Sequence, residues 1–186
     1  MSENYSKSIR IENDEKAFDA EEWEFKSHQF ISSAKFLAQS FDDRADTLDF
    51  DSIMFLPTAE FLLSFSIELI CKAYYLAKGD GPREAIYGHD VVSLFQSSEL
   101  TSEQTKLLEH TARYVIWAGK YPTPKWTKEK FKKDSDVPSE IVNGIERINA
   151  LDMPGTSSRP RVDEMFELYS FIHDLWSKAK GVPSSA

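Results

Sequence analysis

Apolar side chains dominate one long stretch in the middle of the chain, residues 52–78. One line of apolar or small residues recurs there at steps of three and four, the period of an α-helix: Ala59, Leu62, Leu63, Ser66, Ile70, Ala73, Tyr74 and Ala77. Large apolar residues also occupy the other sides, and a helix that is apolar nearly all round belongs at the centre of a helical bundle. Gly79, Gly81 and Pro82 then follow, as is common after a helix ends. The pattern predicts a buried central helix.

Five other segments show helical spacing. The predicted helices span residues 20–41, 91–95, 101–117, 138–150 and 162–176. In the fourth of them, Ile141, Ile145 and Ile148 lie on one side of the expected helix. No two segments combine strand alternation with the turn residues of a β-hairpin. We therefore predict an all-α fold, a bundle of four to six helices.

The composition agrees with one folded domain. The chain has 186 residues, of which 41% are hydrophobic and 13% aromatic. A chain of this length fits a single domain and can bury a core without disulfides or metals. Residues 1–19 are expected to form a flexible acidic N-terminal tail, residues 20–180 the helical domain, and residues 181–186 a flexible C-terminal tail.

Several features bear on the compartment. Cys71 is the single cysteine, so no internal disulfide requires an oxidising environment. Residues 1–16 lack the apolar run of a signal peptide. The longest apolar stretch is interrupted by Glu60, Glu68 and Lys72, which argues against a membrane span. We expect a cytoplasmic protein that does not associate with membranes.

Three blocks of the sequence resemble the HEPN superfamily of helical domains. The first is the buried stretch 59–73, which ends in Glu68-Leu-Ile-Cys-Lys-Ala; the others are Gly88-His-Asp-Val and residues 113–122, which end in Lys120-Tyr-Pro. The resemblance extends over residues 20–180. It implies an antiparallel helical bundle that frequently dimerises, with roles in RNA cleavage, toxin–antitoxin pairs, phage defence or nucleotide binding.

Catalytic members of that superfamily carry an arginine and a histidine in the pattern R-x(4–6)-H, usually on a late helix, and these residues meet across a dimer. The matching helix here holds Arg113, but no histidine follows it within six residues. The literal match is Arg83 with His89, in the loop before the third helix. An imidazole can act as base for the 2′-hydroxyl of RNA, and a guanidinium can bind the phosphate. We favour the alternative, in which His89 holds the loop through a backbone hydrogen bond.

Four polar residues fall at steps of four on the predicted central helix: Glu60, Ser64, Glu68 and Lys72. Glu68 precedes Lys72 by four residues, the favourable order for an ion pair. Charges inside a bundle have to be paired. We favour a structural ion pair that sets helix register; the alternative is a small polar pocket for a nucleotide or a metal. The spacing does not match a di-iron site, and we expect no metal.

The stretch 117–133 interleaves aromatic rings with lysines. It contains Trp117, Lys120, Tyr121, Lys125, Trp126, Lys128, Lys130, Phe131, Lys132 and Lys133. Six lysines and one glutamate give residues 120–133 a net charge of +5, which leaves −14 for the rest of a chain whose total is −9. Rings that stack on bases and ammonium groups that bind phosphates suit single-stranded nucleic acid. There are two alternatives to a nucleic-acid site: the stretch is a solvated loop, or it binds an acidic protein.

No Gly-rich phosphate loop, C-x-x-C, H-E-x-x-H or G-x-S-x-G motif occurs, so no cofactor is expected. The function we favour is a non-catalytic HEPN-like domain that binds RNA or a cognate protein through residues 117–133, in a toxin–antitoxin or phage-defence context. The alternative is a metal-independent ribonuclease that uses Arg83 and His89. A homodimer is expected from the resemblance, and because Leu168, Phe171 and Leu175 add a second apolar side to the last helix.

Overall fold

The computed structural model describes residues 17–44, 55–96, 98–118, 139–142, 145–148 and 159–181. Within these ranges the chain forms four α-helices: α2 (Ala20–Asp42), α4 (Phe55–Lys78), α5 (Ser102–Ala118) and α7 (Arg159–Ala179). Two short 3-10 helices, η1 (Arg83–Tyr87) and η2 (Val92–Leu94), connect α4 to α5. The predicted helices 20–41, 52–78, 101–117 and 162–176 correspond to the four α-helices, and 91–95 corresponds to η2.

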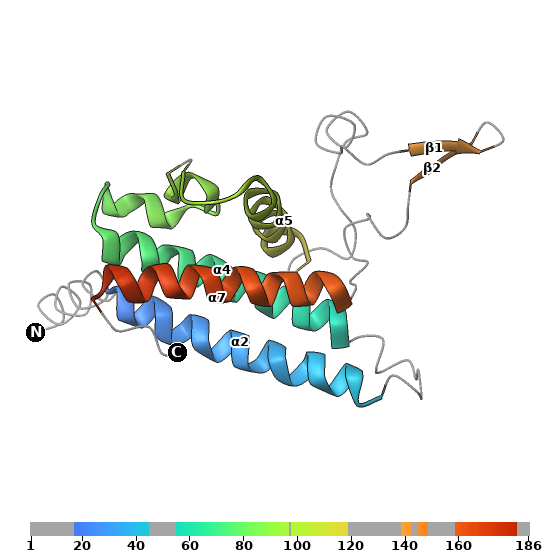
Figure 1. Ribbon diagram of the computed structural model, residues 1–186, viewed down its shortest axis with the longest axis horizontal. Helices are drawn as coiled ribbons and strands as arrows, with labels where there is room; N and C mark the ends of the chain where they lie inside the picture. The colour runs from blue at the N-terminus through green and yellow to red at the C-terminus, as the bar shows by residue number, and fades with distance from the viewer. Residues whose placement is uncertain are drawn as a thin grey trace, which may run out of the picture.

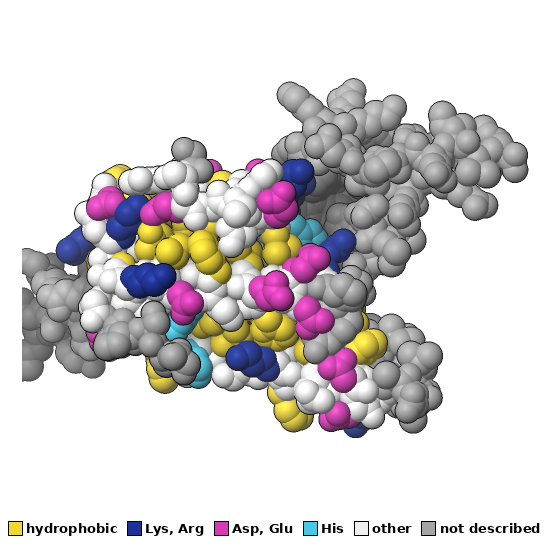
Figure 2. Space-filling model, viewed as in Figure 1, with side chains coloured by type: hydrophobic (Ala, Val, Ile, Leu, Met, Phe, Trp, Pro, Cys, Tyr) yellow, Lys and Arg dark blue, Asp and Glu magenta, His cyan; other side chains and the backbone are white. Residues whose placement is uncertain are grey.

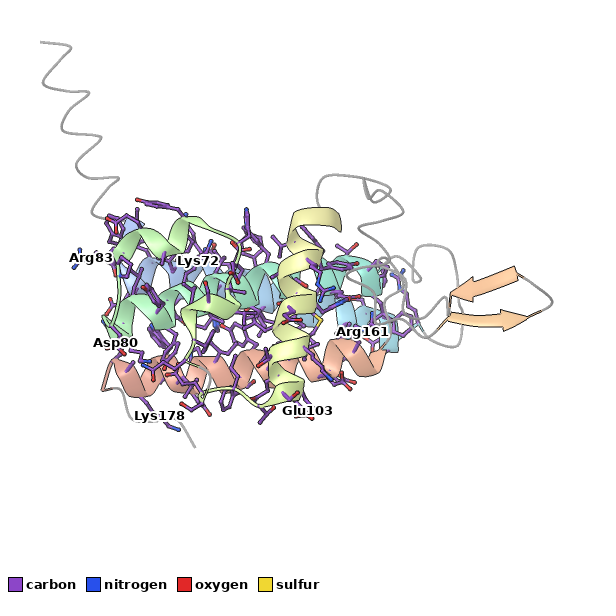
Figure 3. The ribbon with its side chains drawn as sticks, turned by 90° about the horizontal axis from the view of Figure 1, so that it is seen from above. Lys72, Asp80, Arg83, Glu103, Arg161 and Lys178 are labelled. Carbon is purple, nitrogen blue, oxygen red and sulfur yellow. The ribbon has the colours of Figure 1, made fainter. Side chains whose placement is uncertain are left out.

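The helix α4 lies at the centre and packs against α2, α7 and α5. In Figure 1, α2, α4 and α7 lie side by side along the long direction of the molecule, and α2 runs opposite to the other two. Figure 3 shows α5 crossing the bundle at a steep angle over α4 and α7. The described core is therefore all-helical, with the most apolar helix in the middle, as the sequence pattern predicts.

The contact between α2 and α4 combines small residues with paired hydroxyl groups. Ala34 and Ala38 of α2 are buried, which allows the two helices to approach closely. Nearer the start of α2, the Ser27 hydroxyl donates to the Ser66 carbonyl at 2.8 Å, and the Ser66 hydroxyl donates to the Ser27 carbonyl at 2.8 Å. These reciprocal bonds satisfy two buried hydroxyl groups without any charge.

The ends of the helices follow local sequence signals. Asp19 caps α2 by accepting a hydrogen bond from the Glu21 amide at 2.9 Å. Before α5, Thr101 and Gln104 form the expected capping box: the Thr101 amide donates to the Gln104 side chain at 2.9 Å, and the Gln104 amide donates to the Thr101 hydroxyl at 3.2 Å. Gly79 follows α4 in a left-handed conformation with φ of 70°, which favours glycine.

The second apolar side of α7 is covered within the chain. Leu168 belongs to the buried core, and Phe171 and Leu175 pack against that core. Phe171 and Leu175 are partly buried, so this second apolar side is at least partly covered by the chain's own core, and the homodimer stays a prediction.

The predicted helix over 138–150 is wrong. The chain there forms two antiparallel strands, β1 (Ser139–Val142) and β2 (Ile145–Ile148), which pair Val142 with Ile145 and Ser139 with Ile148. The residues that separate the strands in the sequence are Asn143 and Gly144, the pair that two-residue hairpin turns favour. β-Branched isoleucine and valine also favour strands. The spacing of three isoleucines had suggested a helix, but the turn residues are the stronger signal.

The structure describes the last three residues of the predicted N-terminal tail. Residues 17–19 are part of the folded unit: the indole nitrogen of Trp23 donates to the Ala17 carbonyl at 2.8 Å, and the Phe18 ring contacts the Tyr87 ring. The remaining residues of the predicted tails, 1–16 and 182–186, lie outside the described residues. Among the described helices, none combines the length and apolar character needed to cross a membrane.

Candidate functional site: the polar line of α4

The four polar residues on α4 are all buried. Glu60 and Ser64 are completely covered, Glu68 is 2% exposed and Lys72 is 5% exposed. Their spacing of one residue per helical turn, with a slow drift, places them on one side of the helix. Because a buried polar group without a partner destabilises the fold, the partners of these side chains define what the site can do.

Both oxygens of the Glu68 carboxylate have partners. The Lys72 ammonium donates to Oε1 at 2.5 Å, in the i,i+4 arrangement expected from the sequence. Nδ1 of His89 lies 3.1 Å from each carboxylate oxygen. Lys72 also lies over the ring of Trp23, with Nζ 5.2 Å from the ring centre. The buried charge pair is therefore enclosed by residues from α2, α4 and the loop that follows η1.

This arrangement fixes the orientation of the His89 ring. A carboxylate can only accept, so the nitrogen that faces Glu68 carries the proton. The other nitrogen, Nε2, is then either a lone-pair acceptor or a second donor. The His89 side chain is 47% exposed. The His89 carbonyl accepts a hydrogen bond from the Val91 amide at 3.0 Å, and the His89 side chain is bonded to a buried carboxylate, which holds the loop against α4.

Arg83 does not pair with His89 among the contacts of the described residues. Its guanidinium lies over the ring of Phe18, 5.7 Å from the ring centre. The Phe18 ring also meets the Tyr87 ring edge-on, at 5.9 Å between centres. In Figure 3, Arg83 projects from the end of the bundle while Lys72 lies inside it. We call the group of Phe18, Arg83, Tyr87 and His89 the η1 surface.

The surface charge around η1 is mixed. On the face of the molecule that Figure 2 shows, acidic and basic side chains are interspersed. Glu84 and Asp90, both exposed, belong to the same segment as Arg83 and His89. The η1 surface is therefore suited to a local contact with a small anionic group, and less to a long polyanion.

The Glu60 carboxylate is only half satisfied. Its Oε1 lies 2.8 Å from Nε2 of His110, which reaches over from α5. Among the described residues, its Oε2 has no hydrogen-bond partner, and neither has the hydroxyl of Ser64 one turn later. Further along α5, the Tyr114 hydroxyl lies 3.5 Å from the Pro57 carbonyl, a second link between α5 and the start of α4.

A third histidine also pairs with a glutamate from another helix. His173 of α7 lies 3.5 Å from Glu24 of α2, and its ring stacks on Tyr169 at 6.0 Å. Burial raises the pKa of the Tyr169 hydroxyl, and hydrogen bonding from Ser27 only partly opposes the rise. Three of the four histidines therefore link two elements through a carboxylate. No local sequence signal identifies these pairs, because each depends on how distant segments pack.

A further carboxylate, Glu99, ties the end of α4 to the segment before α5. It accepts hydrogen bonds from Tyr74 at 2.5 Å, from Lys78 at 2.8 Å and from the Gln96 amide at 2.6 Å. Burial acts to raise the pKa of Glu99, but the bonds from Lys78, Tyr74 and Gln96 outweigh it, so this pKa is lowered. Burial and the bond to Glu99 raise the pKa of Tyr74 to about 12.

Two kinds of chemistry have no support in the described residues. No group of three or more histidine, cysteine, aspartate or glutamate side chains is placed there to hold a metal ion. Cys71 is completely buried, and burial, followed by the nearby Glu68 charge, raises the pKa of its thiol. The thiolate that a nucleophilic cysteine needs is therefore disfavoured, and Cys71 is a core residue.

The lysine-rich stretch predicted as a binding segment falls almost entirely outside the described residues. The backbone of Trp117 lies in the last turn of α5, while residues 119–138 are not described. The binding role of the residues in this stretch therefore stays a prediction from the sequence. The contacts of Tyr87 and of His110, in contrast, were not foreseen from the sequence.

Comparison of the chain with protein-family models, with curated proteins and with solved structures finds no match in any of the three.

Proposed function

We propose that this protein is a non-catalytic, HEPN-like domain that binds single-stranded RNA. The observation that carries the proposal is the uneven charge of the chain. Residues 120–133 hold six lysines and one glutamate in a protein whose net charge is −9. Within the surrounding stretch 117–133, two tryptophans, one tyrosine and one phenylalanine alternate with those lysines. Aromatic rings stack on bases of any identity, and lysines replace the counterions of the phosphates.

The contacts of Arg83 and His89 favour a structural role for these two residues over a catalytic one. The side chains of the R-x5-H match have separate partners, Phe18 for Arg83 and Glu68 for His89. His89 holds the loop after η1 against a buried ion pair. A residue with such a structural role explains the presence of the motif without catalysis.

The remaining parts of the proposal rest on the resemblance. A HEPN-like chain is an antiparallel bundle that works as a homodimer in the cytoplasm, often beside a cognate partner in a toxin–antitoxin or phage-defence system. A cognate protein with an acidic surface is the second ligand that would suit the charge of residues 120–133. The binding experiment below distinguishes it from RNA.

A ribonuclease is the second candidate function, and one contact favours it. The bond from His89 to the buried Glu68 carboxylate leaves Nε2 of the imidazole directed away from Glu68, with 47% of the side chain exposed. An imidazole oriented by a carboxylate is a suitable general base, and Arg83 from a second copy could hold the phosphate. Cleavage of RNA in the presence of EDTA, lost in His89→Gln, would establish this alternative.

The binding proposal is tested by fluorescence anisotropy of a labelled single-stranded RNA at several salt concentrations. If about four phosphates are contacted, the logarithm of the affinity should fall with the logarithm of salt with a slope of about −3. Lys130→Ala with Lys132→Ala should weaken binding and flatten this slope. Lys26→Ala with Lys35→Ala, two exposed lysines of α2, removes the same charge elsewhere and should change neither.

No binding at low salt would contradict the RNA proposal. In that case, binding of an acidic protein that is lost in the Lys130 and Lys132 variant would favour the cognate partner. Cleavage of the RNA by the unmodified protein would show that the domain is an enzyme and would replace the non-catalytic proposal.

A further inference from the structure

Tyr87 stands out among the exposed aromatic residues. Three large apolar side chains of the described residues are exposed: Phe25 at 59%, Phe36 at 71% and Tyr87 at 61%. Phe25 and Phe36 lie on the outer side of α2. Tyr87 instead packs edge-on against Phe18, which fixes one side of its ring while most of the side chain remains open to solvent. An aromatic ring held in this way loses little freedom when a ligand stacks on it.

The Arg83 guanidinium and the Tyr87 ring both contact Phe18. The Arg83 guanidinium lies over the Phe18 ring at 5.7 Å, and the Tyr87 ring meets the same ring at 5.9 Å. Guanidinium has five donors in a planar arrangement that matches a phosphate. The buried residue Ile86 anchors η1 between Arg83 and Tyr87 along the chain. The η1 surface therefore presents a stacking ring and a phosphate-binding group on one short, anchored segment.

The neighbouring groups limit the size of the ligand. Glu84 and Asp90 offset part of the positive charge of this segment, and His89 and Lys72 share the Glu68 carboxylate. These carboxylates disfavour several phosphates at this place, whereas one nucleotide within a longer strand brings a single phosphate next to a flat base. Bases stack on aromatic rings regardless of their identity.

We propose that the η1 surface is a subsite for one nucleotide of a single-stranded RNA, with the base stacked on Tyr87 and the adjoining phosphate bound by Arg83. This inference rests on the proposed RNA-binding function and adds to it a second contact, separate in sequence from residues 117–133. Phe18 acts as a positioning residue, since it contacts both Arg83 and Tyr87 and does not itself need to touch the RNA.

The test uses the full chain and a labelled single-stranded RNA, with an abasic ribose-phosphate oligonucleotide of the same length as a second probe. Tyr87→Ala should weaken RNA binding by about 5- to 150-fold, the range for loss of one stacked base. Tyr87→Phe keeps the ring and should bind within about twofold of the unmodified protein. Phe25→Ala removes an equally exposed ring on α2 and should have no effect. Circular dichroism should confirm that all variants are folded.

Three further results separate stacking from charge. With the abasic probe, Tyr87→Ala should bind as tightly as the unmodified protein, because no base is present to stack. Arg83→Gln should flatten the salt slope by about 0.7, the contribution of one phosphate on a single strand. Glu84→Gln removes a nearby negative charge and should tighten binding of both probes.

The outcomes that overturn the inference differ from those that overturn RNA binding itself. If Tyr87→Ala binds RNA as tightly as the unmodified protein while Lys130→Ala with Lys132→Ala weakens binding, the subsite is wrong and RNA binding stands. If Tyr87→Ala weakens binding of the abasic probe as strongly as binding of RNA, the ring does not stack on a base. If the unmodified protein does not bind RNA at low salt, both proposals fail.

Discussion

Two buried carboxylates on the same helix, Glu60 and Glu68, differ in how many of their oxygens have hydrogen-bond partners. Each lies on the polar side of α4 and each meets a histidine from another segment. Glu68 also has the Lys72 ammonium, so that both of its oxygens are engaged. Glu60 meets His110 through one oxygen, and among the described residues the other oxygen has no partner.

The two carboxylates differ because the cation beside Glu68 lies on the same helix, whereas the partner of Glu60 lies on another helix. The partner of Glu68 is built into the helix four residues later, so the pair forms as soon as α4 forms. The partner of Glu60 arrives only when α5 packs onto α4. We therefore expect the Glu68 site to behave as a complete buried ion pair and the Glu60 site as a polar contact with spare hydrogen-bonding capacity.

The largest effect is expected from removing the cation of the complete site. Lys72→Met leaves the Glu68 carboxylate buried with only His89, and should lower the free energy of unfolding by about 3–5 kcal/mol. Urea denaturation at pH 7 measures the loss. Combining Lys72→Met with Glu68→Gln removes both charges and should recover most of it; no recovery in the double variant would contradict a buried ion pair.

A smaller effect on stability is expected at Glu60, and it can have either sign. Glu60→Gln keeps an oxygen for His110 and places an amide nitrogen within one helical turn of the Ser64 hydroxyl, which lacks a partner among the described residues. The free energy of unfolding should change by less than about 1 kcal/mol in either direction. Glu68→Gln, the matched change at the other site, should be clearly more destabilising in the same urea titration. An equal loss at both positions would remove the distinction between them.

A third carboxylate, Glu99, extends the comparison to the edge of the bundle. Because its folded pKa is lowered below the ordinary value of 4.5, its contribution is present above pH 4.5 and is lost as pH falls through the lowered value. Glu99→Gln should therefore cost up to about 1 kcal/mol at pH 7, limited by the partial exposure of Lys78 and Glu99, and less at pH 2. Urea midpoints at the two pH values measure this. A loss of the same size at both pH values would show that the negative charge of Glu99 does not contribute to the stability of the fold.

The smallest effect is expected for a carboxylate on the solvent-exposed side of α5. Glu109 and Arg113 form an exposed pair on α5, 3.4 Å apart, with nearly half of each side chain in solvent. Glu109→Gln should change the free energy of unfolding by less than about 0.5 kcal/mol, since exposed pairs gain little over hydration. A loss comparable to that of Glu68→Gln would mean that burial does not set the order of these effects.

The sequence predicts the helical core well because its signals are local. The apolar period of α4, the glycine after it and the capping box before α5 each act within a few residues. The Glu68–Lys72 pair is local in the same sense, four residues apart on one helix. These features could be read without knowing how the chain folds back on itself.

The features that the sequence did not reveal depend on distant contacts or on a competing pattern. The partner of Glu60 is His110, fifty residues away, and it is determined by how α5 crosses α4. The position of Tyr87, which follows α4, depends on Phe18, which precedes α2. In the segment 138–150, isoleucines at steps of four and three imitate a helix, while Asn143 and Gly144 favour the hairpin that forms.

The hydroxyl pair between Ser27 and Ser66 has a consequence for how the molecule opens. These reciprocal bonds lie within an extensive contact between α2 and α4, whereas α4 packs over a much smaller contact against α5. The order of local opening follows from this contrast. In hydrogen exchange, the amides of α5 should lose their protection first, while α2 and α4 exchange together as a single slow unit.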